Sequence, residues 1–65
     1  MHLNVEIDPP GAKLLLDGAI MSNPLQMTYP TSGVVHEIRG EAPGYLTRAT
    51  SITFDRDVLV VLALT

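Results

Sequence analysis

The chain has 65 residues, 46% of them hydrophobic, and a formal net charge of −3, so it has room for one small domain. Its four Lys and Arg residues are scattered singly, which argues against nucleic-acid binding and against a polybasic membrane patch. It has no Cys, no signal-peptide pattern at its start, and no apolar run near the about 20 residues that a membrane-spanning helix needs.

Alternating residues predict the first strand. Leu3, Val5 and Ile7 alternate with polar residues, a two-residue period that buries one side of a strand. The run Asp8-Pro9-Pro10-Gly11 ends it, because neither proline has the N–H of a sheet ladder. We expect Gly11 to adopt the positive φ of a type II turn. Since this strand starts almost at the first residue, we expect the chain to be one domain of a longer protein.

Two further strands are predicted over residues 12–16 and 19–21. The pair Asp17-Gly18 between them favours a two-residue hairpin, because both residue types tolerate positive φ. The run Ser22-Asn23-Pro24 then interrupts the chain before a fourth strand over residues 25–29.

After a loop over residues 30–33, a fifth strand is predicted with Val34, His36 and Ile38 on its inward side. Gly40 lies on the same side without a side chain, which predicts either a bulge or a close approach by another strand. The strand ends at Pro43-Gly44, a second predicted type II turn.

The sixth strand lies within residues 46–54, with Ile52 and Phe54 facing the same way. Residues 58–64 are apolar on both sides, so we expect them to lie centrally in a sheet or against a partner. No segment has a helical period. The sequence therefore predicts an all-β fold, a small antiparallel β-sandwich of about six to seven short strands.

Four segments in order resemble a PEGA domain, a small β-sandwich module. Residues 5–13 (Val-Glu-Ile-Asp-Pro-Pro-Gly-Ala-Lys) resemble its opening, Leu16-Asp17-Gly18 its first hairpin, and residues 23–25 its Thr-Pro-Leu step with Asn in place of Thr. Residues 36–45 (His-Glu-Ile-Arg-Gly-Glu-Ala-Pro-Gly-Tyr) resemble its most distinctive stretch, although Gly40 replaces the usual β-branched residue. The resemblance covers a single domain over residues 3–64.

The resemblance implies a non-catalytic accessory module of a larger bacterial or archaeal protein, associated with the cell envelope or with a signalling protein such as a serine/threonine kinase. It favours an extracytoplasmic location and leaves a cytoplasmic one open. It implies no catalytic site and no cofactor. The residues shared with the family form turns: Pro10, Gly11, Asp17, Gly18, Pro24, Pro43, Gly44 and Tyr45.

His36 is the first candidate for acid–base chemistry or ligand binding. The pattern places no nucleophile or second ligand near it, so we expect a structural hydrogen bond inside the sandwich. With His2 as the only other His and no Cys, a structural zinc site is not expected. Asp55 and Asp57 offer too few oxygens for calcium on their own, so we expect a solvated turn, with a calcium site as the alternative.

Two interpretations of function follow. The first is a non-catalytic interaction module or spacer that contacts other domains of its parent protein, another protein or a second copy of itself. Its contact site is predicted at residues 58–64, with Val58 and Val60 as candidate binding residues, because a strand edge can accept an added strand. The alternative is glycan or cell-wall polymer binding by Tyr29 and Tyr45, although we expect each ring to pack on the core edge and to bond backbone through its hydroxyl. We expect no enzymatic activity.

Overall fold

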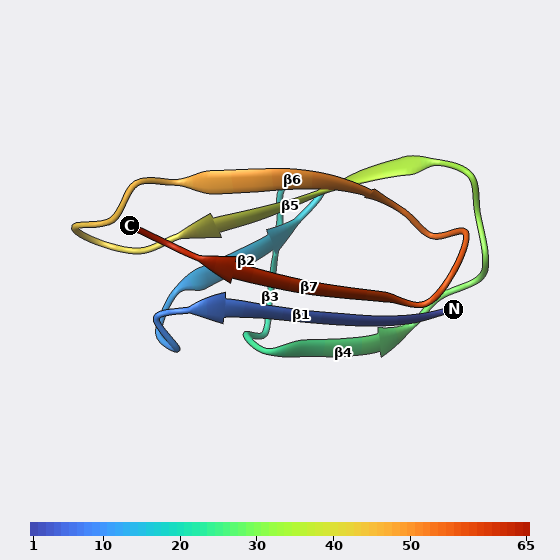
Figure 1. Cartoon of the computed structure of the whole chain (residues 1–65), viewed down its shortest axis with the longest axis horizontal. Coiled ribbons are helices and arrows are strands. Elements are labelled where there is room, and N and C mark those ends of the chain that lie inside the picture. Colours follow the sequence, from blue (N-terminus) through green and yellow to red (C-terminus); the bar gives the residue numbers. More distant parts are fainter.

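Short alternating segments produce an all-β structure. The computed structural model describes residues 1–65 and contains seven strands and no helix (Figure 1). In chain order they are β1 (His2–Asp8), β2 (Lys13–Leu16), β3 (Ala19–Met21), β4 (Leu25–Thr28), β5 (Val35–Glu41), β6 (Arg48–Thr53) and β7 (Val58–Ala63). The predicted all-β fold is confirmed. No helix long and apolar enough to cross a membrane is found.

The strands form two sheets, one of three strands in the order β4-β1-β7 and one of four in the order β3-β2-β5-β6 (Figure 1). All neighbouring strands are antiparallel except β1 and β7, which run parallel with Leu3 beside Val58 and Ile7 beside Leu62. The expectation of an antiparallel sandwich therefore misses one pair. That pair joins the first and last strands, which local sequence patterns do not relate to each other.

The expectation of a central position for residues 58–64 is wrong, because β7 is an edge strand. Apolar residues on both sides are typical of strands covered on both sides. In β7 one of these sides faces solvent instead, and Leu59 is 74% and Val61 63% exposed.

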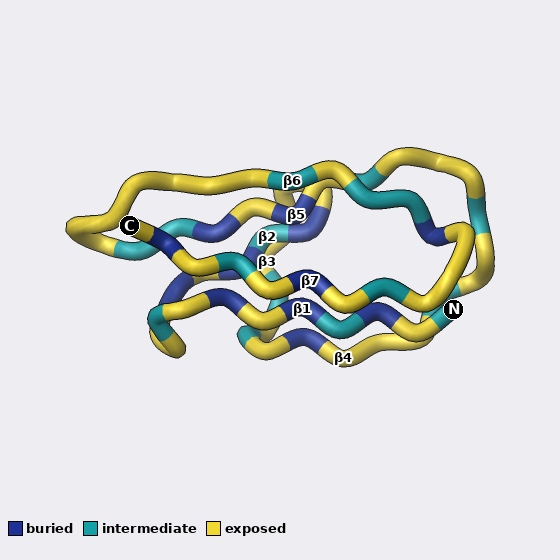
Figure 2. The backbone as a smooth tube through the Cα atoms, viewed as in Figure 1, coloured by how far each residue is buried: buried dark blue, intermediate teal, exposed yellow.

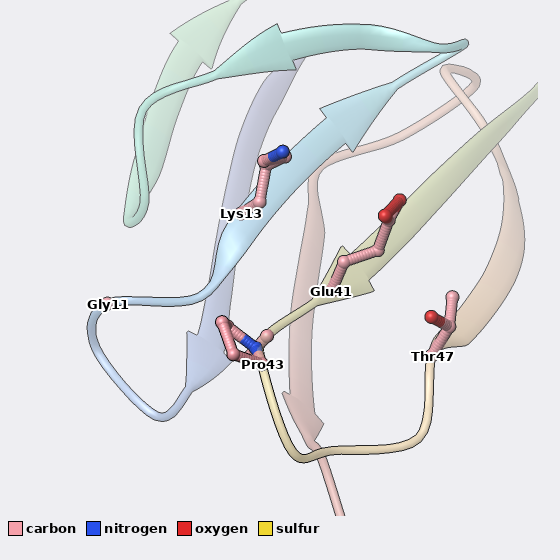
Figure 3. Close-up of a pocket in the computed structure, with 6 residues that line it drawn as sticks. Gly11, Lys13, Glu41, Pro43 and Thr47 are labelled. Carbon is pink, nitrogen blue, oxygen red and sulfur yellow. The ribbon is translucent and has the colours of Figure 1, made fainter.

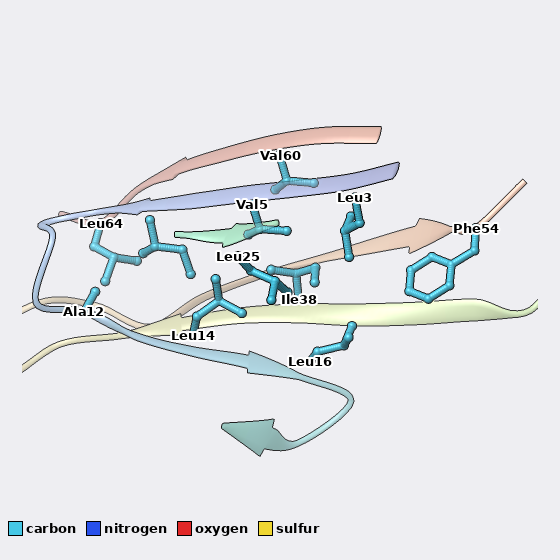
Figure 4. Packing of buried hydrophobic residues seen from close by; sticks show 11 residues of the cluster. Leu3, Val5, Ala12, Leu14, Leu16, Leu25, Ile38, Phe54, Val60 and Leu64 are labelled. Carbon is cyan, nitrogen blue, oxygen red and sulfur yellow. The ribbon is translucent and has the colours of Figure 1, made fainter. Parts of the chain in front are cut away.

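The core lies between the two sheets and takes one side of each long strand (Figure 2). β1 supplies Leu3, Val5 and Ile7, which are at most 1% exposed, as their alternation predicts. Burying one such side chain contributes about 1.5–3 kcal/mol. One cluster of eleven buried hydrophobic residues results (Figure 4): Leu3, Val5, Ile7, Ala12, Leu14, Leu16, Leu25, Ile38, Phe54, Val60 and Leu64.

Gly40 marks a place where the two sheets approach each other closely. It pairs in continuous register with Leu14 of β2 and Arg48 of β6, so the bulge alternative is wrong. A Cβ atom at Gly40 would lie 2.9 Å from Cγ2 of Ile7 in the opposite sheet, and the predicted close approach is confirmed. Val34, predicted to face inward on the same strand, precedes β5 and is exposed.

The turns agree with prediction at two of three places. Asp17 and Gly18 have φ values of 51° and 83°, as the predicted hairpin requires. Gly44 has a φ of 79°, and the Tyr45 N–H donates to the Ala42 carbonyl at 3.1 Å, which confirms the type II turn.

The first Pro-Gly turn differs from the prediction. Its hydrogen bond runs from the Ala12 N–H to the Pro9 carbonyl at 2.9 Å, so Pro10 and Gly11 are the central residues. Gly11 does not adopt positive φ, and the predicted type II geometry is wrong here. The Pro-Gly pair alone does not specify the turn type, because a type I turn also accepts Pro at its second position. The Asp8-Pro9 and Asn23-Pro24 peptide bonds are cis.

Asn23 has a structural role that its sequence context did not reveal. β4 pairs with β1 only as far as Val5, so Ile7 lies beyond the end of β4. The Asn23 side chain takes the place of the missing strand: Oδ1 accepts from the Ile7 N–H at 3.0 Å, and Nδ2 donates to the Ile7 carbonyl at 2.9 Å. The same Nδ2 lies 3.2 Å from the Ala12 carbonyl and 3.3 Å from that of Pro10, which ties the proline turn to β1.

Candidate functional site

Three places carry candidate functional groups. An aromatic stack lies at the end of the sandwich where β1 begins, a depression lies at the opposite end near the proline turns, and β7 forms a free edge between them (Figure 1).

The aromatic stack is built on Phe54, which follows β6. The His36 ring lies against it with 3.9 Å between ring centroids, and the Tyr29 ring with 5.0 Å. Nδ1 of His36 is 2.5 Å from Oδ2 of Asp17, in the hairpin between β2 and β3. His36 therefore forms the predicted structural hydrogen bond, but at the partly exposed rim rather than inside the sandwich.

Asp17 is held by three interactions. Its Oδ1 accepts from the Glu37 N–H at 2.9 Å, and its own N–H donates to the Glu37 carbonyl at 2.9 Å. The hydrogen bond with His36, followed by the one with the Glu37 N–H, lowers the pKa of Asp17 below its ordinary value. Because an ionised carboxylate only accepts hydrogen bonds, Nδ1 of His36 carries the proton. His36 forms no other side-chain hydrogen bond, so this pair has no third group to activate.

The acidic turn before β7 has structural partners for both carboxylates. Oδ1 of Asp55 accepts from the Thr53 hydroxyl at 3.0 Å, and Oδ1 of Asp57 accepts from the His2 N–H at 2.7 Å. His2 also places Nδ1 3.2 Å from the Thr28 hydroxyl. The structure brings together no group of three or more His, Cys, Asp or Glu side chains that could hold a metal ion.

The depression lies between the two Pro-Gly turns and has a volume of 340 Å³ (Figure 3). Its two charged residues, Lys13 of β2 and Glu41 of β5, are cross-strand neighbours that point to the same side (Figure 3). The other lining residues are small or belong to the turns: Gly11, Ala42, Pro43 and Thr47. Such an open site offers one cation, one carboxylate and one hydroxyl, without the enclosed apolar wall typical of ligand pockets.

The two tyrosines do not share a face. Tyr29 packs on Phe54, as expected, and its N–H donates to the carbonyl of Met1 at the N-terminus. Tyr45 is 45% exposed, so the expectation that it packs on the core edge is wrong. Its neighbour Leu46 donates its N–H to the carbonyl of Thr65, so Tyr45 lies near the C-terminus, whereas Tyr29 lies near the N-terminus. The two chain termini lie at opposite ends of the molecule (Figure 1).

In β7 the structure separates the candidate binding residues from the accessible ones. Val60 is buried and Val58 is half-buried, so both face the core. Leu59 and Val61 are the residues that a partner can reach. Sequence reasoning identified the strand but not these positions, because a strand that is apolar at every position gives no signal for its outward side.

Comparison with known proteins adds no relative. No family model, curated protein or solved structure matches the chain. The resemblance to PEGA domains stays a prediction.

Proposed function

We propose that this chain is a non-catalytic interaction module that binds a protein strand along the open edge of β7. Consistent with its resemblance to PEGA domains, it would act as an accessory domain of a larger protein of the bacterial envelope or of bacterial signalling. Its partner would be another domain of that protein, a separate protein or a second copy.

The observation that carries this proposal is the coincidence of two features in β7. The strand has a sheet neighbour on one side only, and Leu59 and Val61 are exposed next to its open side. Unpaired backbone groups give affinity for an added strand, and exposed alternate side chains give it specificity.

The other candidate sites support chemistry less well. The pair of His36 and Asp17 has no nucleophile to activate. Glycan binding by Tyr29 and Tyr45 rested on a shared exposed face, and one ring is stacked on Phe54 while the other lies at the opposite end. No observation in the structure favours the glycan alternative.

The test is site-specific photo-crosslinking of the natural full-length protein in its source cells. A photoreactive amino acid replaces Leu59 in one variant and Val35 in the control. Val35 is a matched control because it lies on β5 in the other sheet and is 63% exposed. We expect protein adducts from position 59 and far fewer from position 35. Equal labelling at both positions, or none at position 59, would contradict the proposal.

A further inference from the structure

Three hydrogen-bonded backbone groups show which way the N–H and C=O groups of each residue point along β7. The Leu64 N–H donates to the carbonyl of Asp8 at 2.9 Å, so even-numbered residues of this segment face β1. The carbonyls of Ala63 and Thr65 accept from Arg48 Nη1 at 3.0 Å and from the Leu46 N–H at 2.6 Å, so odd-numbered residues face the other way. Residues alternate in this manner along any strand.

Leu59 and Val61 therefore direct their N–H and C=O groups toward the open side. No turn or loop hydrogen bond involves these groups, and β7 has no second strand neighbour that could bond to them. Beyond them the edge is closed, because Arg48 and Leu46 occupy the carbonyls at Ala63 and Thr65. The open segment therefore consists of residues 59–61, in which Leu59 and Val61 lie on either side of Val60.

We infer that β7 pairs antiparallel with β7 of a second copy of this chain, about a two-fold axis at Val60. This inference rests on the proposed function and names its partner. Such pairing places Leu59 opposite the partner's Val61, and Val61 opposite the partner's Leu59. Residues that face each other in a hydrogen-bonded antiparallel pair exchange both of their hydrogen bonds. The pairing thereby satisfies every unpaired backbone group of the open segment.

The side chains agree with this pairing. Leu59 and Val61 of one copy lie directly opposite Val61 and Leu59 of the other, and apolar cross-strand neighbours at such positions attract each other. β7 carries no charged residue and no proline, the usual means by which edge strands prevent pairing between copies.

The open segment is its own complement, which favours a second copy as the partner. A two-fold axis at Val60 pairs Leu59 with Val61 twice, and no residue of β7 is charged. Asp57 takes no part in the contact, because its Oδ1 accepts from the His2 N–H of the same chain.

The size of the interface sets the expected affinity. The accessible surface of one copy is 4060 Å². A standard stable interface takes about 800 Å² from each partner, which is about a fifth of this surface and more than one strand edge covers. We therefore expect a weak dimer with a dissociation constant of about 0.1–1 mM.

Amide hydrogen exchange of the 65-residue chain, measured by NMR against protein concentration, tests the pairing residue by residue. We expect the N–H groups of Leu59 and Val61 to exchange quickly in dilute protein and about two- to fivefold more slowly near 1 mM, where a dimer of this affinity is partly populated. The N–H groups of Val60 and Leu62 face β1, so they serve as internal controls that are protected at both concentrations.

Two pairs of variants test the register. Val61→Lys is expected to weaken the dimer at least about tenfold, because it places an ammonium group against the partner's Leu59. Val35→Lys, at a position of equal exposure in the other sheet, is expected to leave it unchanged. In this chain without Cys, Val60→Cys is expected to form a disulfide between copies on mild oxidation, because residue 60 faces its own counterpart; Val35→Cys is the control.

The outcomes separate this inference from the proposed function. A chain that stays monomeric near 1 mM, or a dimer that is insensitive to Val61→Lys, overturns the self-pairing. If crosslinks from position 59 to a different protein are still found, the interaction module stands and only its partner changes. If neither dimer nor crosslink is found, both proposals fail.

Discussion

Strand pairing ends in two different ways in this molecule. Beyond the end of β4, Ile7 of β1 lacks a strand neighbour on that side, and the amide of Asn23 bonds to both its N–H and its C=O. Along the open side of β7, Leu59 and Val61 also lack a strand neighbour, and no side chain replaces it.

A polar residue also closes a strand edge at the end of β2, as Asn23 does at Ile7. β2 pairs with β5 as far as Ile38, and Asp17, the next residue after β2, bonds to both backbone groups of Glu37. At both closed places a polar residue just outside a strand satisfies the backbone of the neighbouring strand. At these two places a local polar residue closes the edge, whereas no side chain bonds to the open side of β7 beside Leu59 and Val61, which leaves it available for pairing.

The largest expected effect comes from opening the closed edge at Ile7. Asn23→Ala removes the donor and the acceptor for Ile7 and frees the carbonyls of Pro10 and Ala12. We expect the free energy of unfolding to fall by about 3 kcal/mol, because several partly buried backbone groups lose their partners at once. Urea unfolding measures it, with Gln26→Ala on the exposed face of β4 as a control expected to change it by less than about 0.5 kcal/mol. A loss as small as that of the control would show that water replaces the amide at no cost.

A smaller loss is expected at the turn that precedes the closed part of the β7 edge. Gly44 has a φ of 79°, and Leu46, two residues later, bonds to Thr65. Gly44→Val places a β-branched residue at positive φ and is expected to cost about 1–3 kcal/mol. Gly11→Val is the matched control, because Gly11 lacks positive φ and a Cβ atom added there would have no neighbouring atom within 4 Å. Equal melting temperatures for the two variants would contradict this difference between the Pro-Gly turns.

Much of the fold follows from local patterns. Alternation at Leu3, Val5 and Ile7 predicts β1 and its buried side, and Asp17-Gly18 predicts the hairpin. The missing side chain at Gly40 predicts a bulge or a close approach, and the structure shows the second, with Ile7 of the other sheet against it. These predictions succeed because each depends on residues that are neighbours in the chain or on the shape of one residue.

The rest depends on contacts between distant residues. The parallel pairing of β1 with β7 joins the two ends of the chain, and the bonds of Asn23 reach back to Ile7. The exposed residues of the candidate site were missed for a related reason. Val60 and Leu59 are both apolar, so which of them is buried depends on the sheet that β7 joins. The strand was therefore predictable as a contact region, and its exposed residues were not.

Lowering the pH tests the second closed edge, where Asp17 bonds to Glu37. The expected loss of stability is smaller than that caused by the substitutions at Asn23 and Gly44, because Asp17 is exposed. The hydrogen bonds of Asp17 with His36 and Glu37 lower its pKa from the ordinary 3.8. Its ionised form therefore adds stability that is fully present above pH 3.8 and is lost as the pH falls through the lowered pKa. NMR titration is expected to show a pKa below 3.8 for Asp17, and Asp17→Asn is expected to remove this part of the acid sensitivity. Titration at or above 3.8 would contradict the closed arrangement at Glu37.

The smallest expected effect lies at the open edge itself, at Val61, and the same substitution at the adjacent Val60 is the contrasting variant. In dilute protein, Val61→Thr is expected to change the free energy of unfolding by less than about 0.5 kcal/mol, because the side chain is already in solvent. Val60→Thr buries a hydroxyl between the sheets and is expected to cost about 1–3 kcal/mol. Urea unfolding of both variants measures the difference. If Val61→Thr were as costly as Val60→Thr, Val61 would be packed within the single chain, and β7 would have no free edge to offer a partner.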